Sequence, residues 1–178
     1  MPFAIVIYFD RKTEETIHNN WKAFADKNID PYLYKSENRP HIKLGMYERV
    51  HIDKCRDRLK EFSQNNRVMN ILFKNIGIFP LEKPIVYLGA ASSKQILETQ
   101  IEINNGMKDI AREKNGEYFI PGGWTPDCQL TVGVEKRVLA EAINIASEIP
   151  IPMRGKITEI GLIEFFPAKK LFEYKLKK

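Results

Sequence analysis

The stretch NRPHIKLG, from Asn38 to Gly45, is the part of the chain that decides the fold. Its residues alternate in polarity, so in a strand His41 and Lys43 point to one face while Ile42 and Leu44 point to the other. The alternation predicts a half-buried strand whose polar face carries an imidazole and an ammonium group.

A second stretch, GWTPDCQLTVG from Gly123 to Gly133, has the same frame far along the chain. Here Asp127 and Gln129 share one face of the predicted strand, and Cys128 and Leu130 share the other. An aspartate thus stands where the first stretch has a histidine, and a glutamine where it has a lysine. Two matched strands with polar faces predict a polar-lined cleft.

The separation between matching residues is nearly constant, which indicates an internal duplication. The matches are Pro40-His41 with Pro126-Asp127 and Leu44 with Leu130 at 86 residues, Ile76-Gly77 with Ile160-Gly161 at 84, and Phe79-Pro80 with Phe166-Pro167 and Tyr87 with Tyr174 at 87. We therefore predict an α+β fold in one bilobal domain, 1–178, with duplicated β-α-β-α-β-β lobes at 1–83 and 84–178. Two mainly antiparallel sheets would line a central cleft in which His41 and Asp127 face each other.

Apolar residues at helical spacing predict amphipathic helices between the strands. The first is predicted to have Thr13 as its N-cap, and a later one to have Ser92 or Ser93, because hydroxyl side chains accept hydrogen bonds from the free N–H groups of a first turn. The three residues 104–106, NNG, are a candidate interruption of that later helix. The apolar faces are predicted to comprise Ile17, Trp21 and Phe24 in the first helix and Cys55, Leu59 and Phe62 in the second.

Composition places the chain in the globular class, with 43% apolar residues among 178. The longest apolar runs, such as Phe3–Phe9, are far shorter than the roughly 20 residues that span a bilayer, and no signal-peptide pattern opens the chain, so we expect a cytoplasmic protein without membrane contact. Cys55 and Cys128 are isolated, which argues against a disulfide framework or a zinc site and favours buried free thiols. The net charge of +5 is compatible with a phosphate ligand, but it lacks the dense basic stripe of proteins that bind duplex DNA.

The duplicated motif, the chain length and the ending EIGLIEFFPAKKLFEYKL resemble the two-histidine phosphoesterase superfamily, which includes 2'-5' RNA ligase-like proteins and RNA 2',3'-cyclic phosphodiesterases. The resemblance covers essentially the whole chain. That family has a pair of H-x-T or H-x-S motifs, in which the histidines act as general acid and base on a phosphodiester while the hydroxyls hold phosphate oxygens. It implies an RNA end or a small nucleotide phosphodiester as the ligand, no metal or organic cofactor, and no particular oligomeric state.

Only one of the four hallmark positions matches. His41 corresponds to the first histidine, whereas Lys43 occupies the first hydroxyl position, Asp127 replaces the second histidine and Gln129 replaces the second hydroxyl residue. The resemblance therefore implies a divergent member in which His41 is the acid or the base and Asp127 is its altered partner; one arrangement has Asp127 as the base and His41 as the acid. Lys43 and Gln129 would bind phosphate oxygens as a cation and an amide donor.

Three further residues near the motifs are candidate substrate contacts: Arg39 for phosphate, and Tyr34 and Trp124 for stacking on a base. Solvation of Arg39 and core packing of the two aromatic residues are the alternatives. For the whole protein, three functions remain open. One is a phosphodiesterase or ligase-like enzyme with weak or altered activity, and another is a nucleotide- or RNA-binding module that has lost turnover. The third is a structural or interaction protein whose cleft is vestigial.

Overall fold

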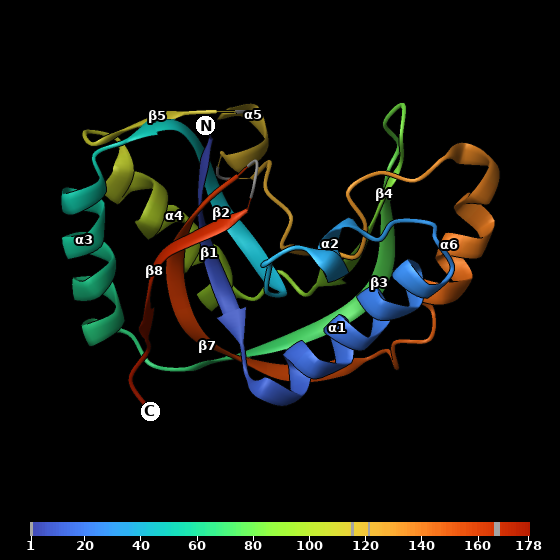
Figure 1. The fold of residues 1–178 in the computed structure, drawn as a ribbon. Helices are drawn as coiled ribbons and strands as arrows, with labels where there is room; N and C mark the ends of the chain where they lie inside the picture. The colour runs from blue at the N-terminus through green and yellow to red at the C-terminus, as the bar shows by residue number, and fades with distance from the viewer. Residues whose placement is uncertain (1, 115, 121, 166–167) are drawn as a thin grey trace.

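The computed structural model describes residues 2–114, 116–120, 122–165 and 168–178, and Figure 1 shows its fold. The strands are β1 (Phe3–Phe9), β2 (His41–Val50), β3 (Met69–Phe79), β4 (Ile85–Ala90), β5 (Ala111–Glu113), β6 (Asp127–Gln129), β7 (Met153–Glu164) and β8 (Lys169–Lys175). The helices are α1 (Arg11–Asp26), α2 (Tyr32–Lys35), α3 (Ile52–Asn65), α4 (Lys94–Met107), α5 (Gly116–Phe119), the 3₁₀ turn η1 (Lys136–Val138) and α6 (Leu139–Ala146). None of the helices in these ranges is long and apolar enough to cross a membrane.

The strands form one hydrogen-bonded sheet in the order β5-β2-β1-β7-β3-β4-β6, with β8 also paired to β7, and the pairs between them are antiparallel. Strand β7 connects the β3-β4-β6 part of the sheet to the β5-β2-β1 part. Its residues Met153–Ile157 pair with β3, and the residues after Ile157 pair with β1 on one edge and with β8 on the other. The duplication predicted two separate sheets, and the structure differs in this respect. The 12 residues of β7 are long enough to serve both parts of the sheet. The predicted match at Phe166-Pro167 lies outside the described residues.

Helices α3 and α4 lie on one side of the molecule, and α1 and α6 lie on the other (Figure 1). Helix α4 runs without interruption through Asn104–Gly106 and is capped by Ser93, whose hydroxyl accepts from the Ile96 N–H at 3.3 Å. The predicted apolar faces of α1 and α3 are confirmed as buried: Ile17, Trp21, Phe24, Cys55, Leu59 and Phe62. Both cysteines are buried free thiols, as predicted.

The start of α1 differs from the prediction, because Asp10 and not Thr13 is the N-cap. The Asp10 carboxylate accepts from the Thr13 N–H at 3.3 Å and the Thr13 hydroxyl at 2.8 Å, and from the Lys156 N–H on β7 at 2.6 Å. Thr13 lies one turn inside the helix, where its hydroxyl binds the cap. One aspartate thus fixes α1 to the sheet.

Replacing Asp10 with alanine is expected to lower the free energy of unfolding by about 0.5–2 kcal/mol at pH 7, the usual effect of losing an N-cap. Burial acts to raise the pKa of Asp10, but the hydrogen bonds from Lys156 and Thr13 outweigh it and the pKa is lowered. The carboxylate therefore stabilises the fold above its unfolded pKa, and this stabilisation is lost as the pH falls through the folded value. Urea unfolding at neutral and acidic pH measures both effects.

Asp26→Ala is the matched control, since its carboxylate lies at the other end of α1 in an exposed ion pair with Lys22. It should change stability by a few tenths of a kcal/mol at most. An Asp10→Ala variant no less stable than Asp26→Ala would contradict the cap's role.

Candidate functional site

The two motif strands, β2 and β6, lie near opposite ends of the strand order and contact each other. The Trp124 indole N–H, from the segment just before β6, donates to the Lys43 carbonyl of β2 at 3.1 Å. The Trp21 indole N–H of α1 donates to the Gln129 carbonyl of β6 at the same distance. The backbone of His41 also forms a hydrogen bond with the thiol of Cys128. The predicted approach of the two motif strands is therefore present.

A pocket of about 400 Å³ opens beside these strands. It is lined by Tyr32, Leu33, Asn38, His41, Lys43, Met46, Gln129, Val132 and Phe165. Three of the predicted site residues thus share one cavity, and most of the rest of its wall is apolar or aromatic. Among the described residues, no group of three or more histidine, cysteine, aspartate or glutamate side chains could hold a metal ion.

His41 is the first residue of β2 and is only 8% exposed. Its Nδ1 lies 2.6 Å from the Arg39 carbonyl oxygen, and because a carbonyl can only accept, Nδ1 carries the proton and Nε2 carries the lone pair. Burial lowers the pKa of His41 to about 4, and the charge of Lys43 acts in the same direction. The imidazole is therefore neutral at pH 7 and its Nε2 offers a lone pair, which fits the base of the two roles predicted for His41.

Lys43 lies two residues along β2 on the same face as His41. Its Nζ donates to the Gln129 Oε1 at 2.9 Å, so residues 86 apart in the chain form a direct contact across the two strands. Burial lowers the pKa of Lys43, while the charge of Asp127 raises it. A desolvated ammonium binds anions strongly and also gives up a proton more easily than a solvated one.

Asp127 is close enough to influence Lys43 but is not among the described residues that line the pocket. The Tyr118 hydroxyl on α5 donates to its Oδ1 at 2.8 Å. Burial raises the pKa of Asp127, with Lys43 and the Tyr118 hydrogen bond opposing it. Tyr118 was not predicted as a site residue, because nothing in the sequence pattern of its loop indicates which way its side chain points.

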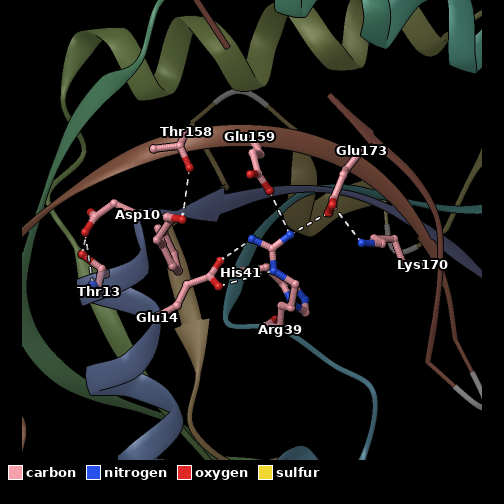
Figure 2. A network of polar contacts seen from close by, with 10 residues as sticks. Asp10, Thr13, Glu14, Arg39, His41, Thr158, Glu159, Lys170 and Glu173 are labelled. Atoms are coloured by element: carbon pink, nitrogen blue, oxygen red, sulfur yellow. Dashed lines mark hydrogen bonds and ion pairs between the residues drawn. The ribbon is translucent and has the colours of Figure 1, made fainter. Parts of the chain in front are cut away.

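The three predicted substrate contacts are not among the residues that line this pocket. Arg39 is held by glutamates from three elements, as Figure 2 shows, and does not line the pocket. The Tyr34 ring packs against His18, with centroids 5.0 Å apart. Trp124 is 6% exposed and bonds to the backbone of β2. These side chains already have protein partners, so the alternative of core packing applies to Trp124 and the solvated alternative does not apply to Arg39.

The aromatic and apolar wall of the pocket was not predicted. Tyr32 and Val132 are 38% and 43% exposed, and Phe165 also lines the pocket, with its ring centroid 5.7 Å from the Lys43 Nζ. Such a wall beside a cation suits a ligand with a flat apolar ring and an anionic group. Sequence periodicity gave no signal for it, since Tyr32 and Val132 lie outside the strands.

No protein-family model matches the sequence, and a search of curated proteins finds no match. The fold, however, is that of several solved structures. The protein TT0787 of Thermus thermophilus is similar over 99% of this chain and 98% of its own, at 13% identity and a TM-score of 0.65. A structure described as a phosphoesterase gives the same coverage at 15% identity and a TM-score of 0.64.

Escherichia coli LigT without ligand is similar over 99% of this chain and 98% of its own, at 17% identity and a TM-score of 0.60. LigT has also been solved in complex with 3'-AMP and with NADP+. At these identities the similarity establishes the fold.

Proposed function

We propose that this protein binds an RNA end or a small nucleotide phosphodiester in the His41–Lys43–Gln129 pocket and acts on it by acid–base chemistry of the 2'-5' RNA ligase or cyclic phosphodiesterase type. The observation that carries the proposal is that a neutral imidazole and a partly buried ammonium group line the same pocket. In this assignment His41 is the base, and Lys43 with Gln129 holds the phosphate oxygens.

The ligand class follows from the two kinds of surface in the pocket. Lys43 and the amide of Gln129 offer N–H donors to a phosphate, and charge-assisted bonds of this kind are among the strongest hydrogen bonds in proteins. The aromatic rings of Tyr32 and Phe165 offer flat surfaces to a base. The complex of LigT with 3'-AMP supports the same class, since it concerns a protein of the same fold.

For a 2',3'-cyclic phosphate the proposed reaction is hydrolysis. His41 Nε2 takes a proton from water as the water oxygen forms a bond to phosphorus, and the bond from phosphorus to one ribose oxygen breaks. That ribose oxygen takes a proton from the Lys43 ammonium, which replaces the second histidine of the resembling family as proton donor. Asp127, bound to Tyr118, then serves as the charged partner that keeps Lys43 protonated.

The second candidate function is a binding module without turnover. It is favoured by the hydrogen bond between Tyr118 and Asp127, because a carboxylate held in this way is a poor substitute for a catalytic histidine. Both candidates use the same pocket and the same ligand class, so turnover distinguishes them.

The test incubates the purified protein with 2',3'-cyclic nucleotides and with RNA that ends in a cyclic phosphate, and measures 3'-AMP binding by calorimetry. We expect turnover by the wild type and a loss of roughly tenfold or less in Asp127→Asn, since a residue that acts only through the Lys43 charge contributes less than the 10²–10⁴ typical of a proton-transfer group. A larger loss would make Asp127 itself a proton-transfer group.

Asp127→His is the informative companion variant, because it restores the histidine of the resembling family. Turnover by Asp127→His alone, with 3'-AMP binding by both proteins, would establish the binding module. If neither protein binds or turns over any member of the panel, the phosphodiester ligand is rejected.

A further inference from the structure

The most connected polar group among the described residues is the Arg39 guanidinium, two residues before His41 (Figure 2). Its Nη2 lies 2.8 Å from Glu14 of α1, and its Nη1 lies 2.9 Å from Glu159 of β7 and 2.6 Å from Glu173 of β8. Its planar group also stacks over the Tyr8 ring of β1, 4.2 Å from the centroid. Four elements thus hold one side chain.

These contacts are partly buried, unlike most surface ion pairs. The Arg39 side chain is 30% exposed and the three glutamates are between 16% and 28% exposed, so solvent screens the charges less than it would on an open surface. The planar guanidinium matches several carboxylates at once, which a lysine cannot do. With its donors directed at protein carboxylates, Arg39 is poorly placed to bind a substrate phosphate.

The backbone of the same residue orients the proposed base. The Arg39 carbonyl oxygen lies 2.6 Å from the His41 Nδ1, and the Tyr8 ring under the guanidinium also meets the His41 ring edge-on at 6.2 Å. Because Arg39 precedes Pro40, its backbone is confined to extended conformations, which couples the side-chain anchor to the direction of the carbonyl. Arg39 therefore connects the cluster of glutamates, through its side chain, to the His41 imidazole, through its carbonyl oxygen.

We infer that Arg39, fixed by Glu14, Glu159 and Glu173, is a positioning residue that holds His41 in the Nδ1–H tautomer, with the Nε2 lone pair free to act as a base. The inference rests on the proposed function only for the role of that lone pair; the tautomer itself is a property of the free protein. It replaces the predicted role of Arg39 as a phosphate contact.

The tautomer is measured directly in ¹⁵N-labelled protein, since long-range ¹H–¹⁵N spectra show which ring nitrogen carries the proton and the chain has only three histidines to assign. We expect the Nδ1–H form for His41 in the wild type. In Arg39→Gln the Nε2–H form should become detectable, because the carbonyl is no longer anchored. If Arg39→Gln leaves the His41 spectrum unchanged, the inference is wrong.

Activity separates positioning from substrate binding. Arg39→Gln should lower kcat by about 10- to 100-fold, because a small misplacement of a reacting group has effects of this size, and should leave KM within about threefold. Arg39→Lys, which keeps the charge but not the fork of donors, should fall between the wild type and Arg39→Gln. A rise in KM with kcat unchanged would instead mean that Arg39 binds the substrate.

Two further variants keep the test decisive if Arg39→Gln folds poorly. Glu159→Gln removes one carboxylate and should reproduce part of the tautomer change, and combining it with Arg39→Gln should add little, since both act through the same cluster. Arg58→Gln is the matched control, because Arg58 makes two bonds of 2.6 and 2.8 Å to Asp109 at an exposed site. It should change neither the spectrum nor kcat.

If no substrate is turned over, the proposed function fails while the tautomer measurement still decides the role of Arg39. If turnover is found and Arg39→Gln does not change the His41 tautomer, the positioning role of Arg39 is rejected and the proposed function stands.

Discussion

Replacing His41 with alanine is expected to lower kcat by about 10²–10⁴-fold on 2',3'-cyclic nucleotides while binding of 3'-AMP weakens only slightly. The imidazole supplies the lone pair that accepts the proton of water, and no other described residue of the pocket wall offers a neutral nitrogen base. The phosphate contacts of Lys43 and Gln129 remain in the variant. The measurement is steady-state kinetics together with calorimetry on the same preparation.

The pH dependence of the wild type provides a second readout of the same group. A base acts unprotonated, and burial lowers the pKa of His41 to about 4, so kcat/KM should stay level from neutral pH downwards and fall only as the pH approaches that value. On the alkaline side kcat/KM should begin to fall at a pH below 10.5, the ordinary pKa of lysine. Burial lowers the pKa of Lys43, so the proton donor is lost at a lower pH. A rate that falls already near pH 6.5, the ordinary histidine pKa, would contradict the assignment.

His51→Ala is the matched control, since His51 is exposed and lies just before α3, at the opposite end of β2 from His41. It should leave kcat and the pH profile unchanged. Equal losses in His41→Ala and His51→Ala would mean that the assay reports folding and not chemistry.

Replacing Lys43 with methionine is expected to weaken 3'-AMP binding by roughly 10- to 150-fold, which corresponds to the ~1.5–3 kcal/mol of a hydrogen bond to a charged group. Methionine keeps much of the aliphatic stem and removes the ammonium group, so the effect reports the charge. Lys60→Met, on the exposed face of α3, is the control for a change in net charge and should leave the affinity unchanged. Unchanged affinity in Lys43→Met would remove Lys43 from the site.

Lys43→Arg separates the two proposed roles of this residue. Arginine retains a positive charge for the phosphate but is not deprotonated in proteins, so it cannot act as the acid. If Lys43 donates the proton, this variant binds 3'-AMP and loses turnover. If it retains turnover, Lys43 only holds the phosphate and the acid is another group.

The local structure followed from the sequence because its signals are local. Period-two alternation predicted β2 and the faces of His41 and Lys43, and helical spacing predicted the buried faces of α1 and α3. The N-cap of α1 was assigned to Thr13 because its hydroxyl fits the pattern. The actual cap, Asp10, bonds to the Thr13 N–H locally and also accepts a hydrogen bond from Lys156 on a distant strand, and no local pattern contains this second bond.

The candidate site was predicted in part for the same reason. Repetition of the motif frame was enough to bring Lys43 and Gln129 together as phosphate-binding candidates. It was not enough to place Asp127, because its neighbour Tyr118 comes from a short helix whose orientation depends on the tertiary fold. It also gave no sign of the ion pairs of Arg39, whose carboxylate partners are 25 to 134 residues away along the chain.

The sequence by itself determined which residues form strands and helices and which side chains share a face, since both follow from backbone periodicity over a few residues. Only the tertiary structure decided which polar groups meet. It brought residues of β2 and β6 into one pocket and surrounded Arg39 with three glutamates. It also placed the Tyr118 hydroxyl where it donates a hydrogen bond to Asp127. The physical reason is that charge, burial and hydrogen bonding act through space, and the groups they couple at this site are mostly far apart in the chain.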